Sequence, residues 1–168
     1  MKPEFKIRRS IRNWLLFFIS ALIVSGITAF ALETELAWLN HLLRNSHGPV
    51  SFWIGKVYTA LRETNRQYPF LAYGYDWLGF AHLVIAVAFF GVLKDPVRNK
   101  WIVQFGRIAC CMIFPLAFIA GHFRGIPFYW QLIDCSFGAV GLIPLSYCYH
   151  EIDQLEILIK KDLAWNKV

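Results

Sequence analysis

The chain has 168 residues, of which 57% are hydrophobic and 17% are charged, and its formal net charge is +6. A soluble domain of this length does not require so much apolar surface, and long uncharged runs are typical of membrane proteins. The basic residues cluster by position beside the apolar runs. This distribution disfavours nucleic acid as a partner and favours membrane lipid.

The first apolar run extends from Trp14 to Leu32 and contains no charged residue. It is long enough to cross a hydrocarbon core of about 30 Å, so it predicts a membrane helix over about 12–32. A basic leader precedes the run, which also describes a signal peptide, and Ala29-Phe30-Ala31 resembles a cleavage site. We expect a retained helix, because the run is longer than a usual signal core.

A long connection over 33–75 follows the first run. Two short helical patterns occupy 34–43 and 50–65, and His47-Gly48-Pro49 separates them as a breaker. Each pattern has one apolar face, which is typical of helices that lie in the membrane interface. Aromatic residues then gather where the chain re-enters lipid, as in an interfacial belt: Tyr68, Phe70, Tyr73, Tyr75 and Trp77.

Three further apolar runs predict membrane helices over 76–93, 101–123 and 128–149. A short polar turn over 94–100 joins the first two of these helices. The tail over 150–168 repeats apolar residues between acids and lysines, and it predicts an amphipathic helix at the membrane surface or against a protein partner.

These elements predict an all-α, integral membrane four-helix bundle that forms a single domain over 1–168. Under this topology the basic leader, the 94–100 turn and the tail lie on one side of the membrane. They carry more lysine and arginine than the 33–75 loop and Arg124 together. The chain is therefore expected to be multi-pass with both termini cytoplasmic, and the 33–75 loop to be an outer loop.

Asp134 is an acid within the fourth apolar run, where charge is costly. It shares a helical face with Gly138 and Gly141, so it is expected to point into the bundle, where small residues allow helices to approach closely. Matching rows on the two preceding helices predict a common seam: Gly79, His82, Ala86, Gly106, Cys110 and Gly121.

Titratable and charged groups from several helices have similar predicted depth in the outer third of the bundle. The candidate ligand-binding residues are Asp134, His82, Arg124, His122 and Asp76. Arg124 would pair with an anionic head group, while Asp134 and His82 would bind or polarise a hydroxyl or carbonyl. The function expected from this cluster is binding of a small amphiphilic or lipid-like ligand.

Structural interpretations of the same residues remain open. Asp134 would then only fix helix register through Arg124 or His82, His122 would be a solvated interfacial residue, and Asp76 would be a helix N-cap. The chain would serve as an accessory subunit of a membrane complex, with the outer loop or the C-terminal helix as the partner surface.

A third alternative is a redox role, with haem held between His82 and His122, or with a metal ion. No histidine pair has metal-site spacing, so no metal ligands are assigned and no cofactor is required. No catalytic motif or nucleophile is identified, which leaves enzyme activity open. The cysteines fall in or beside apolar runs and are expected to be buried thiols that pack between helices: Cys110, Cys111, Cys135 and Cys148.

Overall fold

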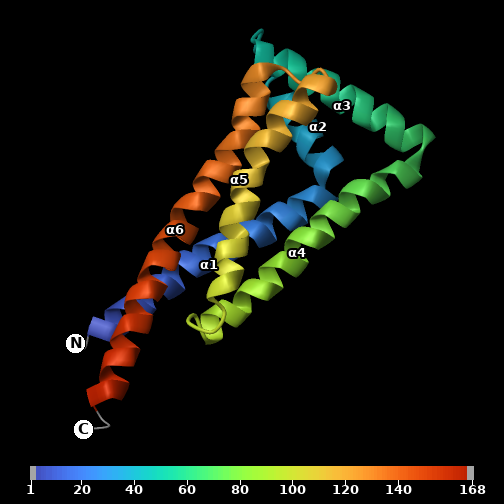
Figure 1. Cartoon of the computed structure of the whole chain (residues 1–168). Helices are drawn as coiled ribbons and strands as arrows, with labels where there is room; N and C mark the ends of the chain where they lie inside the picture. The colour runs from blue at the N-terminus through green and yellow to red at the C-terminus, as the bar shows by residue number, and fades with distance from the viewer. Residues whose placement is uncertain (1–2, 166–168) are drawn as a thin grey trace. The chain divides into compact units, whose positions relative to one another are not determined.

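The computed structural model describes residues 3–165, and nearly all of them are helical. In chain order the elements are α1 (Pro3–Phe30), α2 (Leu32–Leu42), α3 (Pro49–Gln67), the 3₁₀ helix η1 (Pro69–Ala72), α4 (Tyr73–Lys94), α5 (Lys100–Phe123) and α6 (Phe128–Trp165) (Figure 1). The described residues form no β-strand, which confirms the predicted all-α class.

Among the described helices, α1, α4, α5 and α6 are long and apolar enough to cross a membrane. Each of them leaves large apolar side chains exposed along its length, as in Val24, Val87, Leu116 and Phe137. Soluble monomers rarely expose contiguous apolar surface on this scale. The exposed apolar surface and the helix lengths together agree with a membrane protein.

The chain divides into two compact units. The first unit comprises the residues up to Ser20 and from Ala86 onward, and the second comprises Ala21–Ile85. Since α1 and α4 are continuous helices, each contributes one end to each unit. The first unit therefore contains α5 and α6 entire, and the second contains α2, α3 and η1.

In the first unit α5 and α6 lie side by side (Figure 1). A Cβ atom built on Gly138 would lie 2.7 Å from the backbone oxygen of Cys110, and one on Gly141 would lie 2.8 Å from Cys110 Sγ. One on Gly106 would lie 2.9 Å from Leu145 Cδ1. These contacts show that the predicted small-residue faces of the two helices meet, which permits close van der Waals packing.

The beginning of α1 and the end of α4 complete the core of the first unit. The rings of Phe18 and Phe89 lie 4.9 Å apart between centroids, and Trp14 stacks on Tyr147 of α6 at 5.5 Å. The thiol of Cys148 approaches the carbonyl oxygen of Ile11 at 3.7 Å. The N-terminal half of α1 is thus held against the C-terminal half of α6.

The fourth predicted span ends at residue 149, but α6 continues without a break to Trp165 and has 38 residues. The reason is that Ile152 and Leu155 are fully buried in the first unit. The apolar stripe of the tail therefore begins by covering the protein's own core. At 1.5 Å per residue α6 is about 57 Å long, which exceeds a hydrocarbon core of about 30 Å.

The second unit contains the helices predicted within the 33–75 connection. α2 and α3 pack against each other, and the Ser51 hydroxyl donates a hydrogen bond of 3.0 Å to the Leu43 carbonyl oxygen. Pro49 occupies the first turn of α3 behind an extended Gly48, because its fixed φ suits a helix start. The predicted breaker at 47–49 is thereby confirmed as the boundary between two helices.

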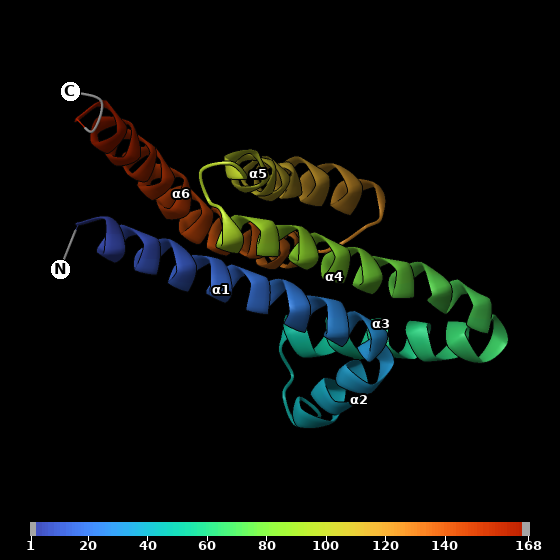
Figure 2. The same ribbon diagram turned by 90° about the horizontal axis from the view of Figure 1, so that it is seen from below.

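The end of α1 and the beginning of α4 lie side by side in the second unit (Figure 2). A Cβ atom on Gly79 would lie 2.7 Å from the Gly26 carbonyl oxygen, and one on Gly26 would lie 2.9 Å from the Gly79 oxygen. Gly79 therefore packs on the first helix, and its assignment to a seam with the third and fourth was wrong. A small-residue face predicts close contact but does not identify the partner helix.

Replacing Gly138 tests the close contact of α5 and α6. Gly138→Leu places atoms where the Cys110 carbonyl lies, so we expect the free energy of unfolding to fall by about 1–3 kcal/mol. Thermal unfolding in a neutral detergent, followed by circular dichroism, measures the change. The neighbouring Ala139 is exposed, so Ala139→Leu is the matched control. An equal loss in both variants would contradict the close contact.

Candidate functional site

Asp134 lies near the beginning of α6, one turn before Gly138, and its side chain is half-buried. It makes no hydrogen bond or ion pair with any residue that the structure describes. An unpaired carboxylate in hydrocarbon is costly, which is why such a residue is a candidate for ligand binding. The register-locking interpretation requires a partner for Asp134, and none is found among the described residues of the first unit.

His82 is satisfied within its own helix. Its Nδ1 atom lies 2.8 Å from the Leu78 carbonyl oxygen one turn earlier in α4. A carbonyl only accepts, so Nδ1 carries the proton in this arrangement and Nε2 is left available. His82 belongs to the second unit and Asp134 to the first, so their predicted pairing stays a prediction.

His122 and Arg124 lie at the exposed end of α5. The helix ends in a Schellman motif, in which Ile126 N donates to the Gly121 oxygen at 2.9 Å and Gly125 N donates to the His122 oxygen at 3.2 Å. Gly125 has a φ of +65°, which a glycine adopts without steric cost. Within the described part of the chain, the Arg124 guanidinium forms no ion pair.

Gln131 holds the turn between α5 and α6, although sequence reasoning did not select it. The side chain is 7% exposed, and its Nε2 donates a 2.8 Å hydrogen bond to the Ile126 carbonyl oxygen. Its amide group occupies the space beside Gly121, where a Cβ would lie 2.7 Å from it. An amide in the first turn of an apolar helix, directly after a glycine turn, is the signal that could have identified it.

Asp76 lies in the first turn of α4, which begins at Tyr73, so Asp76 is not the N-cap residue. Its carboxylate is still favoured there, since the free N–H groups of a helix start attract negative charge. Asp76 lines a cavity of about 290 Å³ together with Phe30, Tyr73, Trp77 and Phe80. Trp77 forms edge-to-face contacts with Tyr73 at 5.8 Å and with Phe80 at 5.7 Å.

A hydrogen-bond network joins three helices of the second unit. Asn65 Nδ2 on α3 donates to Glu33 Oε2 on α2 at 2.7 Å and lies 2.9 Å from the Tyr75 hydroxyl on α4. None of these residues was a candidate from the sequence, because Glu33 and Asn65 lie in a connection where polar side chains are usually solvated. The network fixes the beginning of α4, and therefore the position of Asp76.

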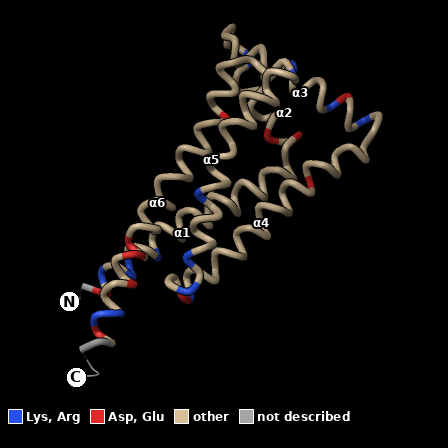
Figure 3. The backbone as a smooth tube through the Cα atoms, in the orientation of Figure 1, with Lys and Arg blue, Asp and Glu red and all other residues tan. Residues whose placement is uncertain are grey.

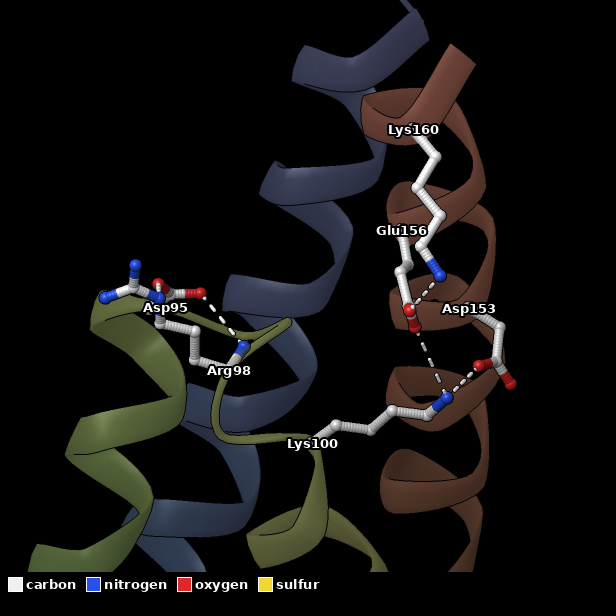
Figure 4. Close-up of polar contacts among 6 residues, drawn as sticks. All are labelled: Asp95, Arg98, Lys100, Asp153, Glu156 and Lys160. Carbon is white, nitrogen blue, oxygen red and sulfur yellow. Dashed lines mark hydrogen bonds and ion pairs between the residues drawn. The ribbon is translucent and has the colours of Figure 1, made fainter. Parts of the chain in front are cut away.

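Charged residues of the first unit gather where α1 begins, where α4 meets α5, and along the end of α6 (Figure 3). Lys100, the first residue of α5, reaches across to α6 (Figure 4). Its ammonium group forms an ion pair with Asp153 and lies 3.7 Å from Glu156, which also pairs with Lys160 at 2.7 Å. The described parts of the predicted basic leader, turn and tail thus belong to one end of this unit.

Among the described residues, no group of three or more histidine, cysteine or acidic side chains is arranged to hold a metal ion. The four cysteines are free thiols. Cys110, Cys135 and Cys148 are buried, as predicted, whereas Cys111 is exposed and its predicted burial was wrong. Comparison of the chain with known protein families, with curated proteins and with solved structures finds no match.

Replacing Asn65 tests the network of the second unit. Asn65→Leu keeps the size of the side chain but removes both hydrogen bonds, so we expect a loss of about 1–3 kcal/mol in the free energy of unfolding. Glu33→Gln keeps an oxygen acceptor and should cost less. Thermal unfolding checks both changes, with Gln67→Leu at an exposed position of the same helix as the control. The network would be refuted by equal stabilities of the Asn65 and Gln67 variants.

Proposed function

We propose that this chain is an integral membrane protein that crosses the bilayer four times and has both termini in the cytoplasm. The four long apolar helices support the spans. The gathering of basic residues at one end of the first unit supports the orientation, because lysine and arginine favour the cytoplasmic side. In this topology α2 and α3 lie at the outer interface.

The proposed function is binding of a small amphiphilic ligand at the cavity beside Asp76. The observation that carries this proposal is that a predicted site residue, Asp76, lines a cavity of about 290 Å³ whose other walls are aromatic. Asp76 has no hydrogen-bond or ion-pair partner among the described residues. Aromatic faces bind hydrocarbon chains and cations, and a carboxylate binds a cationic or hydroxyl head group.

The other predicted site residues keep their proposed role in ligand binding, but with less support. His82 lies on the same helix as Asp76 and keeps a free Nε2. Asp134, His122 and Arg124 have no hydrogen-bond or ion-pair partner from another element among the described residues, and the His122 ring lies 5.8 Å from the adjacent Phe123 ring. The ligand-binding proposal therefore rests on Asp76.

A second candidate function is that of an accessory subunit in a membrane complex. Trp38 on α2 and Phe52 on α3 are 66% and 77% exposed, and Leu163 near the end of α6 is 58% exposed. Exposed aromatic and aliphatic side chains on α2, on α3 and beyond the apolar run of α6 are typical of partner surfaces. Under this function the cavity beside Asp76 needs no ligand.

Substitution of Asp76 separates these two functions. The full chain, purified in a neutral detergent, is titrated with dodecylamine, dodecanol or dodecanoate, and its melting temperature is followed. We expect dodecylamine to stabilise the chain, and Asp76→Asn to weaken its binding roughly tenfold or more, because a charge-assisted hydrogen bond contributes about 1.5–3 kcal/mol. Glu35→Gln removes an exposed acid of the same unit and should bind like the wild type. Equal binding by the Asp76→Asn variant and the wild type would favour the accessory subunit.

Topology is testable with a membrane-impermeant maleimide applied to intact cells. Lys6 and Ser46 are exposed and lie outside the apolar stretches, so each is replaced by cysteine in turn. We expect labelling of Ser46→Cys from outside and labelling of Lys6→Cys only after the cells are opened, with the wild-type chain as background. Labelling of both variants in intact cells would contradict the proposed orientation.

A further inference from the structure

Arg107 is a basic residue within the apolar span of α5. It lies seven residues after Lys100, the first residue of the helix, which corresponds to about 10 Å along the axis. Arginine at such a depth is expensive and usually serves a function when no partner neutralises it. Snorkelling of the long side chain toward the membrane surface is the simplest account of an arginine at this position.

The guanidinium of Arg107 lies over the ring of Tyr149 on α6, with Cζ 4.7 Å from the ring centroid. The same ring holds the ammonium of Lys100 at 4.8 Å. Because Lys100 marks the polar end of α5, the contact with Tyr149 directs Arg107 toward that end. A cation–π contact uses the face of the guanidinium and leaves its N–H edge free for an anion.

Arg107 has no anionic partner among residues 3–165. Lys100 takes Asp153 and Glu156 as its ion-pair partners, while Arg107 forms no ion pair with any described residue, Glu151 included. The Nε atom of Arg107 is buried and donates to no described residue, so the donors that an anion can reach are the two Nη groups. A cation with free donors in an apolar segment has the charge and the geometry to bind an oxyanion.

A cavity of about 400 Å³ lies beside Arg107. Its walls are Gln104, Ile108, Met112, Pro115 and Leu142. Ile108, Met112 and Pro115 follow one another at helical spacing along one face of α5, so the cavity continues from Arg107 toward the middle of the span as an apolar groove. Met112 is 63% exposed, which means that the groove is open on its outer side.

We infer that this groove binds a membrane phospholipid whose phosphate pairs with Arg107. The fork of N–H donors on arginine matches two phosphate oxygens, and Gln104, about one turn nearer Lys100 in the same cavity wall, adds an amide donor. The acyl chain lies along Ile108, Met112 and Pro115, where a free phosphate ion would leave the apolar walls uncovered. A lipid is therefore the occupant that satisfies both the charge and the apolar surface.

This site differs from the one proposed above in its unit, its charge and its ligand. Asp76 is an acid in the second unit, whereas Arg107 is a base in the first. Failure of one site to bind its ligand therefore leaves the other unaffected. Lipid binding also explains the cavity beside Arg107 and its free N–H groups. Snorkelling requires neither of these features.

Native mass spectrometry of the full chain in a neutral detergent tests the inference. The probes are dioleoyl phosphatidic acid, diolein with the same chains but no phosphate, and inorganic phosphate with no chain. We expect the wild type to retain phosphatidic acid at least tenfold more strongly than either control probe. Retention of diolein equal to that of phosphatidic acid would overturn the role of the charge. Equal retention of inorganic phosphate would overturn the lipid as occupant.

Two substitutions test the role of Arg107. We expect Arg107→Gln to lower phosphatidic acid retention at least tenfold and Arg107→Lys to lower it less, since lysine keeps the charge but loses the fork. Arg98→Gln is the matched control, because the Arg98 side chain is 87% exposed in the α4–α5 turn. If Arg98→Gln and Arg107→Gln lowered retention equally, binding would depend only on the total charge of the protein, and the site at Arg107 would be overturned.

A second readout does not depend on replacing Arg107. Cys111 also lines the cavity and is exposed, whereas the other three cysteines are buried. We expect phosphatidic acid, but not diolein, to slow the alkylation of Cys111 by N-ethylmaleimide at least severalfold. Met112→Trp fills the groove while Arg107 is kept, and it should abolish this protection. Unchanged alkylation in the wild type, or full protection in Met112→Trp, would contradict the inference.

Discussion

The close approach of α5 and α6 is the constraint on which the first unit depends. Gly106, Gly138 and Gly141 have no side chains to separate the helices, so the Cys110 backbone lies against α6. If these helices cross the membrane as proposed, no hydrophobic force acts between them, and the contacts gain stability mainly from dispersion. Both ends of the pair are then fixed by polar groups, Gln131 at the turn and Lys100 at the opposite end.

The second unit is held together by one close helix contact and by a hydrogen-bond network. Gly26 and Gly79 bring α1 and α4 together, and Asn65 joins α2, α3 and α4 through its amide. Asn65 is half-buried, and the two partners of its Nδ2 group favour one arrangement, because any alternative leaves these N–H donors unsatisfied. The aromatic cavity beside Asp76 lies at the start of α4 that Asn65 holds in place.

The helices were largely predictable from the sequence, because uncharged runs and the breaker at 47–49 signal them directly. The length of α6 was not predictable. The amphipathic pattern that includes Ile152 and Leu155 suits a surface helix and a helix that packs on the protein core equally well. The predicted partner helix of Gly79 was wrong, because a row of small residues does not show which helix packs against it. Among the site residues, Asp76 was predictable from the sequence, whereas Gln131 and Asn65 were not. The role of Gln131 depends on the Ile126 carbonyl oxygen, and that of Asn65 depends on the Glu33 carboxylate. Only the folded chain brings these partners together.

The stacking of Trp14 on Tyr147 and the contact of Cys148 with Ile11 bear on the order of assembly. The α5–α6 hairpin joins neighbours in the chain, so its contacts form at little cost in loop-closure entropy. The beginning of α1, by contrast, is synthesised before α5 and α6, and it meets its partner on α6 only after the helices between them have been made. In the proposed membrane topology, lipid therefore covers the α6-facing surface of α1 until α6 is present, and α1 docks after the hairpin has formed.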